Sequence, residues 1–189
     1  MQSGSLNHFL FGKYILCVCE GIAEESIIDL LLDNDKLCFS RKDLINNQKC
    51  TRIRNGDRLA SEFLNVEYKK DIVILRILDR ENEKISLPKV YRHNKHISVV
   101  NIVTKPEIEF LHIIAENLEN DFERHKRHQK NLKPSEYCKS YFSQNVKSQD
   151  FILQLYSHNI DKLTDAILSY KSKVKLLESS HYLSELLTL

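Results

Sequence analysis

The 189-residue sequence has few of the residues that interrupt regular structure, with only four glycines and three prolines. This scarcity excludes collagen-like and low-complexity chains, and a hydrophobic fraction of 42% excludes a chain too polar to form a core. The 28 basic and 26 acidic residues leave a formal charge of only +2. Overall charge therefore does not indicate nucleic-acid binding, and any such indication must come from local clusters.

Other absences concern location and redox state. No apolar run is long enough to cross a bilayer, which predicts no membrane association, and residues 1–5 do not begin a signal peptide. The five cysteines are odd in number and lack the Cys-x-x-Cys spacing of zinc sites, although Cys17 and Cys19 share one face of an apolar segment. We therefore expect a reduced, cytoplasmic protein whose cysteines lie in the core.

The most informative stretch runs from Tyr14 to Leu32. An unbroken apolar segment, Tyr14–Cys19, is followed by Glu20-Gly21 and then by a helical pattern of isoleucine and leucine. An apolar strand without alternation is typical of a parallel sheet buried on both faces, and ligands bind where such strands end. Glu20 is therefore predicted to lie at a ligand-binding edge, with Glu24 in the first turn of the next helix.

The remaining pattern alternates strands and helices up to residue 125. We expect strong strands over 71–78 and 97–103, short strands over 36–40 and 50–54, and helices over 58–68, 106–125, 133–144, 149–170 and 176–187. This alternation predicts an α/β fold with a mostly parallel sheet flanked by helices. We expect a domain over 1–130 and a helical extension over 131–189 that packs on it or on a partner. Arg76 interrupts the second strong strand without an evident reason.

Acidic residues follow the end of each strong strand. The first strand leads to Glu20 and Glu24, the second to Asp79 and Glu81, and the third to Glu107, with Glu109 close behind. Because parallel strands end at one edge, these like charges would lie close together, which is costly unless a cation neutralises them. Oxygen ligands favour Mg²⁺ or Mn²⁺, which support phosphodiester cleavage. The alternative is that these acids are ordinary solvated residues of turns and first helical turns.

The segment Cys19-Glu20-Gly21-Ile22-Ala23-Glu24, followed by Leu78-Asp79-Arg80-Glu81, resembles the Toprim domain. Topoisomerases, bacterial primases, a ribosomal-RNA maturase and nucleases of the overcoming-lysogenization-defect type share this domain. Its pattern is Glu-Gly after the first strand, matched by Glu20, and Asp-x-Asp or a variant after a later one, matched by Asp79 and Glu81. Glu24 matches an additional acid of the nuclease branches.

A second segment, Lys105 to Leu111, is similar to the Asn-Pro-x-Phe-Glu segment of small bacterial defence proteins of the RloB type. Lys105 replaces the asparagine, and the acid is displaced. Together the two resemblances cover roughly residues 13–125 and imply a Toprim-like Rossmannoid sheet. They imply catalytic roles for Glu20, Glu24, Asp79 and Glu81, with metal bound by Glu20, Asp79, Glu81 and Glu107.

Within this family a short chain is most similar to the nucleases. The resemblance implies an Mg²⁺- or Mn²⁺-dependent nuclease that acts on RNA, such as tRNA, or on DNA, in anti-phage defence. It also implies a partner that holds the enzyme inactive, for example an ATPase sensor. This chain has no phosphate-binding Gly-x-x-x-x-Gly-Lys-Ser/Thr motif, so it is not expected to supply the ATPase itself.

The densest basic run extends from Arg124 to Lys133. We expect it to contact phosphates, with Lys133 as a cation that stabilises the transition state, although a basic run can equally form a solvated face. Another hypothesis is a non-catalytic interaction subunit built on the same scaffold. A nucleotide-binding α/β protein is a third, disfavoured by the absence of a glycine-rich loop. The apolar C-terminal segment is expected either to cover the sheet or to form a homodimer or partner interface.

Overall fold

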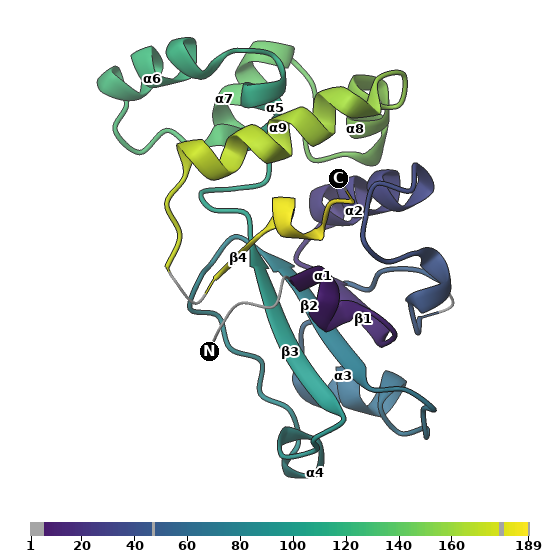
Figure 1. The fold of residues 1–189 in the computed structure, drawn as a ribbon. Coiled ribbons are helices and arrows are strands. Elements are labelled where there is room, and N and C mark those ends of the chain that lie inside the picture. Colours follow the sequence, from purple (N-terminus) through teal and green to yellow (C-terminus); the bar gives the residue numbers. More distant parts are fainter. Residues whose placement is uncertain (1–5, 47, 178–179, 189) are drawn as a thin grey trace.

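The centre of the molecule is a four-stranded parallel sheet (Figure 1). The structure is a computed structural model that describes residues 6–46, 48–177 and 180–188; the residues on which the signal-peptide prediction rests lie outside these ranges. The strands lie side by side in chain order: β1 (Tyr14–Cys19), β2 (Ile72–Leu78), β3 (Ile97–Val103) and β4 (His181–Tyr182). The predicted α/β fold with a parallel sheet flanked by helices is therefore confirmed.

The two central strands show why the sequence has unbroken apolar runs. All seven residues of β2 are buried, as are the last five of β1, because side chains on both faces contact apolar neighbours. The edge of β1 that faces away from β2 has no neighbouring strand among the described residues; Leu44 and Thr51 pair with it through isolated bridges to Ile15 and Val18. The short strands predicted over 36–40 and 50–54 therefore do not form as strands.

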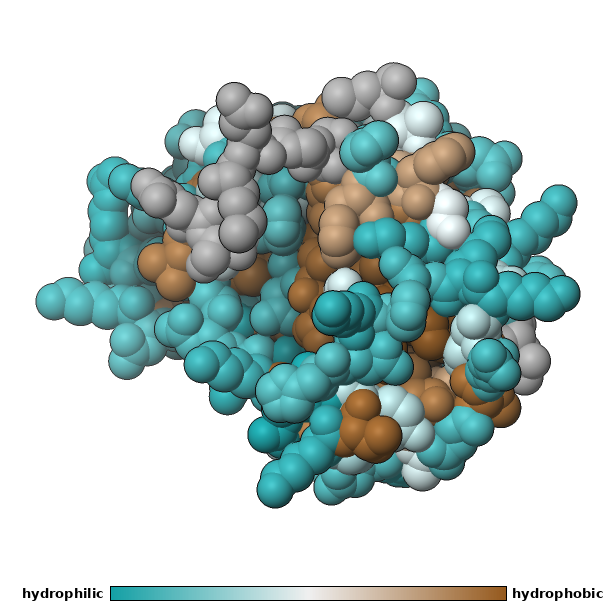
Figure 2. Space-filling view, turned by 60° about the horizontal axis from the view of Figure 1, so that its bottom comes forward, coloured by the Kyte–Doolittle hydropathy of each residue, from teal (hydrophilic) through white to brown (hydrophobic). Residues whose placement is uncertain are grey.

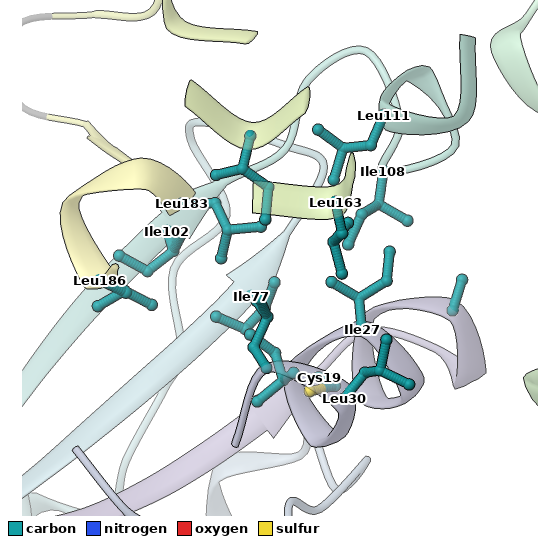
Figure 3. Close-up of a cluster of buried hydrophobic side chains, with 14 of the residues drawn as sticks. Cys19, Ile27, Leu30, Ile77, Ile102, Ile108, Leu111, Leu163, Leu183 and Leu186 are labelled. Atoms are coloured by element: carbon teal, nitrogen blue, oxygen red, sulfur yellow. The ribbon is translucent and has the colours of Figure 1, made fainter. Parts of the chain in front are cut away.

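Helices cover the sheet unequally. One face packs against α2 and the 3₁₀ helix η2, and the core on this face extends to α8 and α9; Ile27, Leu163 and Leu186 belong to it (Figure 3). The other face carries a smaller core built with α3. The helices are α1 (Leu6–Leu10), α2 (Ile22–Asp33), α3 (Gly56–Phe63), α4 (Lys89–Arg92), α5 (Phe110–Ala115), α6 (Glu119–His128), α7 (Pro134–Phe142), α8 (Gln149–Tyr156) and α9 (Ile160–Lys173), with 3₁₀ helices η1 (Arg41–Asp43) and η2 (Leu183–Leu186).

The helices after β3 form a layer over the carboxyl-terminal ends of the strands, at the top of Figure 1. In this layer α5 contacts α7 and α9, and α8 contacts α2. The predicted helix over 106–125 is in fact two helices, α5 and α6, separated at Asn117, whose φ is +57°. The predicted helix over 149–170 is likewise divided, because Asn159 begins α9 by accepting a hydrogen bond from the Lys162 N–H at 3.2 Å.

The C-terminal segment does not form the helix predicted over 176–187. Among the described residues it adds β4 to the sheet and continues as η2; residues 178–179 of the predicted helix lie outside the described ranges. Leu183, Leu186 and Leu187 are buried in the main core, whereas Leu177 is exposed. The apolar residues of this segment thus cover the sheet within the same chain.

The structure also accounts for Arg76 in the middle of β2. Its guanidinium lies on the α3 face of the sheet and donates to the backbone carbonyl and the carboxylate of Glu83. A third contact goes to the side-chain oxygen of Asn101 on β3. This charge is 3% exposed and is paired, which makes its burial tolerable.

Figure 2 shows one face of the molecule, on which long hydrophilic side chains project at the sides and hydrophobic residues are visible between them. Within the described part of the chain, no helix is both long and apolar enough to span a membrane.

Candidate metal centre at the carboxyl edge of the sheet

The parallel pairing of β1 and β2 brings Glu20 next to Asp79. Cys19 is in register with Ile77, so both strands end at the same level and each delivers an acidic residue there. One Glu20 oxygen accepts a hydrogen bond from the Asp79 backbone N–H at 3.2 Å, and the other pairs with Arg54 Nη1 at 2.9 Å. The expectation that strand ends gather these two acids is therefore met.

Glu24 lies in the first turn of α2 and faces back toward the strand ends. The Gly21 N–H donates to its carboxylate at 2.9 Å, and a Cβ atom at position 21 would lie 3.1 Å from the same oxygen. Glycine therefore allows the carboxylate to approach the backbone closely. Burial, reinforced by the charges of Glu109 and Glu20, raises the pKa of Glu24 from 4.5 to about 7.

Two further carboxylates come from the segment that follows β3. Glu107 accepts a hydrogen bond from the Ser135 backbone N–H at 2.9 Å, which ties this segment to the start of α7. The Glu109 side chain is 3% exposed, and its ionic partner Lys147 stands 3.6 Å away. Burial raises the pKa of Glu109 despite this cation.

These acids line a pocket of about 140 Å³. Its walls are Glu20, Gly21, Ile22, Ala23, Glu24, Asp79, Glu107, Glu109 and Lys147.

The least satisfied group of this pocket is Asp79. Its Oδ1 is buried and has no hydrogen-bond partner among the described residues, although the largely exposed Arg80 guanidinium places its Nε 3.8 Å from this oxygen. Burial and then the neighbouring charge of Glu20 raise the pKa of Asp79. An unpartnered carboxylate oxygen among other carboxylates is the arrangement that a cation would stabilise, so the donor set fits a hard divalent ion such as Mg²⁺.

The acids are nevertheless not drawn together around one point. Among the described residues, three or more potential metal-binding atoms approach within 4.8 Å of one another only in a group of three cysteines. In the acidic pocket, the partners described above hold Glu20, Glu24 and Glu107 apart. Binding one ion through several of these acids would require side-chain rotations toward Asp79.

Glu81, predicted as a metal ligand, lies elsewhere. Residues 81 and 82 form a turn, so Glu81 does not extend beside Asp79 as an extended segment would. Its carboxylate pairs with Lys105 Nζ at 2.8 Å and accepts the Leu177 backbone N–H at 2.7 Å, and Lys105 lowers its pKa. The structure thus places Glu81 in a contact between segments, outside the walls of the acidic pocket.

A second pocket, of about 420 Å³, adjoins the first and shares Asp79 and Glu107 with it. Basic side chains from the strand ends and from the end of α6 surround it. We call this pocket the basic groove; its charged lining is Asp79, Arg80, Lys105, Glu107, Lys126, Lys130 and Lys133. Lys133, predicted as a catalytic cation, therefore lies beside the acidic pocket without lining it.

The sequence places Glu109 among the acids after the third strand but gives it no role in the site, and it does not indicate Lys147 or the pairing of Arg54 with Glu20. Lys147 stands alone in the connection between α7 and α8, so no sequence pattern points to it.

No protein-family model, curated protein or solved structure matches this chain.

Proposed function

We propose that this chain is a metal-dependent nuclease that hydrolyses phosphodiester bonds of RNA or DNA. The observation that carries the proposal is the buried Asp79 Oδ1, which accepts no hydrogen bond from the described residues and lies beside the Glu20 carboxylate at the carboxyl edge of the sheet. Glu24 and Glu107 complete the set of acids that would hold Mg²⁺ or Mn²⁺. When bound, such an ion supplies neutralisation of phosphate charge and a more acidic water.

The chain's own residues supply the rest of the site. Arg54 orients Glu20, and the Gly21 N–H orients Glu24. Lys147 faces Glu109 at the back of the pocket and offsets part of its charge. These contacts leave Asp79 with the more distant Arg80 Nε, at 3.8 Å, as its cationic partner.

The basic groove supports a nucleic-acid substrate. Lysine and arginine side chains bind phosphates mainly through charge, and the groove opens beside the acids rather than on a distant face. A strand lying in the groove would bring a phosphate to Asp79. Lys133 is exposed at this position and is suited to stabilise developing negative charge.

The resemblance to Toprim nucleases is consistent with this chemistry and extends the proposal. It points to an effector of bacterial anti-phage defence that a partner, such as an ATPase sensor, keeps inactive. A homodimer is a further possibility of this proposal that solution mass would test.

Calorimetry with Mn²⁺ and Mg²⁺ tests the metal site. We expect Glu20→Gln and Asp79→Asn to weaken binding by at least about tenfold, since even outer partners of metal ligands contribute 10–100-fold. Glu62→Gln is the matched control, because Glu62 lies on α3 in an exposed pair with Arg58. Equal binding by wild type and Glu20→Gln would refute the assignment of Glu20.

Incubation of the same proteins with RNA and DNA tests the activity. Cleavage should require the divalent ion and disappear in Asp79→Asn, and Lys133→Ala should slow it by roughly 10²-fold while leaving metal affinity unchanged. Host nucleic acids should also be compared after expression of wild type and Asp79→Ala during phage infection, with any partner present.

An interaction subunit without catalysis is the second candidate. The observation in its favour is that Glu20, Glu24 and Glu107 already have protein partners and do not converge. Absence of metal binding, together with intact nucleic acids in all these experiments, would favour this function over the nuclease.

A further inference from the structure

A cluster of three thiols lies beneath the first βα turn, apart from the acidic pocket. Cys17 and Cys19 point from β1 toward the larger core, where Cys19 is seen near Leu30 in Figure 3. Cys50 reaches the same place from the connection between η1 and α3. The three sulfur atoms all lie within 4.8 Å of one another.

Backbone pairing along the edge of β1 holds the thiols together. The Cys19 N–H donates to the Thr51 carbonyl at 2.8 Å, and the Thr51 N–H donates to the Cys17 carbonyl at 2.9 Å. Thr51 is in register with Val18, so its neighbour Cys50 faces the side of the sheet that Cys17 and Cys19 face. The cluster therefore results from ordered backbone rather than from the choice of side-chain rotamers alone.

The surroundings select the kind of ligand. The three cysteines are 1%, 0% and 4% exposed in chain order, and no His, Asp or Glu in the described ranges joins the group as a fourth donor. Zinc in proteins is nearly always four-coordinate, and a site this closed gives little room for a water in the fourth position. Thiolate sulfur prefers soft ions, among them Cu(I), over hard ions such as Mg²⁺.

We propose that Cys17, Cys19 and Cys50 form a three-coordinate binding site for one soft monovalent ion, Cu(I). Binding forms three sulfur–copper bonds and releases to solvent the protons of the thiols that become thiolates; no oxidation is involved. The ion enters from the side of Cys50, which follows the exposed residues Gln48 and Lys49. This site is independent of the proposed nuclease activity.

Anaerobic titration of the full chain with Cu(I), in competition with a chromophoric chelator, tests the proposal. We expect one ion per chain. Cys50→Ala should reduce the affinity at least about tenfold, because loss of even an outer partner of a metal ligand costs 10–100-fold. Cys38→Ala and Cys138→Ala are the matched controls, because both thiols lie outside the cluster and should leave affinity unchanged.

X-ray absorption of the copper-loaded protein should show three sulfur neighbours, and circular dichroism should confirm that Cys50→Ala is folded. If Cys50→Ala were unfolded, Cys17→Ser and Cys19→Ser would be compared in its place. Failure to bind Cu(I), binding that survives loss of these thiols, or a copper site with an oxygen or nitrogen neighbour would overturn the proposal.

Discussion

Glu24 illustrates how a residue suited to a site weakens the fold around it. Its side chain is buried among other acids, so its charged form is disfavoured and its pKa rises to about 7. An ordinary packing position would not retain such a group, because a neutral amide of the same shape would be more stable. A bound cation would offset this loss of stability, since it stabilises the ionised form of Glu24.

The pH dependence of stability follows from this pKa. The folded state holds the Glu24 proton more tightly than the unfolded state, so the contribution of Glu24 to stability decreases as pH rises from 4.5 to about 7 and is constant above. We expect Glu24→Gln to raise the unfolding free energy of the metal-free protein at pH 8 by up to about 3 kcal/mol, at about 1.4 kcal/mol per pKa unit. At pH 4 the difference should vanish.

Urea unfolding of wild type and Glu24→Gln at both pH values, in the presence of a chelator, measures this effect. Glu62→Gln, on an exposed part of α3, should change stability little at either pH. A gain from Glu24→Gln that is as large at pH 4 as at pH 8 would contradict a charge effect at position 24.

At the scale of elements, the junction between α5 and α6 shows how one residue ends a helix. The Leu118 N–H donates to the Ile113 carbonyl at 2.9 Å and the Asn117 N–H to the Ile114 carbonyl at 3.0 Å. With Asn117 in the left-handed region, this is a Schellman motif. The turn redirects the chain so that α6 can leave the layer of α5 and α9 and present its basic end to the groove.

Substitutions at Asn117 test this reading. Asn117→Gly should keep or raise stability, because glycine adopts positive φ without steric cost, whereas Asn117→Ala should lower it by about 1 kcal/mol. At Asn120, an exposed position in the first turn of α6, the order should reverse, because alanine favours a helix more than glycine does. Urea unfolding of the four variants provides the measurement, and the same order at both positions would argue against the motif.

The elements differ in how far sequence could predict them. The central strands were predictable because burial on both faces demands an unbroken apolar run, and Glu20 and Asp79 followed from where those runs end. Asn117 is a residue type that can end a helix, and Asn159 one that can begin a helix. Apolar residues at helical spacing continue on both sides of each, so the sequence pattern predicted one long helix in each case. Glu81 was misplaced because a turn after Asp79 depends on the distant contacts to Lys105 and Leu177, which no local pattern encodes.

At the scale of the whole molecule, the segment after α9 belongs to the core. Leu186 is 0% exposed and meets Ile102 of β3, as Figure 3 shows, whereas Leu177 in the same segment is 51% exposed. We expect Leu186→Ala to cost about 2–5 kcal/mol and Leu177→Ala less than about 0.5 kcal/mol, because only the former leaves a cavity.

Thermal unfolding combined with light scattering separates this reading from an assembly role. Leu186→Ala should lower the melting temperature without changing the mass of the folded protein. A change of mass with an unchanged melting temperature would instead assign Leu186 to an interface between chains.

The position of β4 has a consequence for the order of folding. Residues 181–182 pair with the last two residues of β3, Ile102 and Val103, and η2 contacts α1 near the other end of the sequence. Such pairing between segments far apart in the chain raises the contact order and slows folding relative to a helical protein of this size. Until residues 181–187 have been synthesised, the carboxyl end of β3 lacks its strand partner and the larger core lacks η2, and exposed strand edge and apolar surface favour aggregation. The yield of soluble protein should therefore depend on how quickly synthesis reaches that segment and on the chaperones that shield the edge before it arrives.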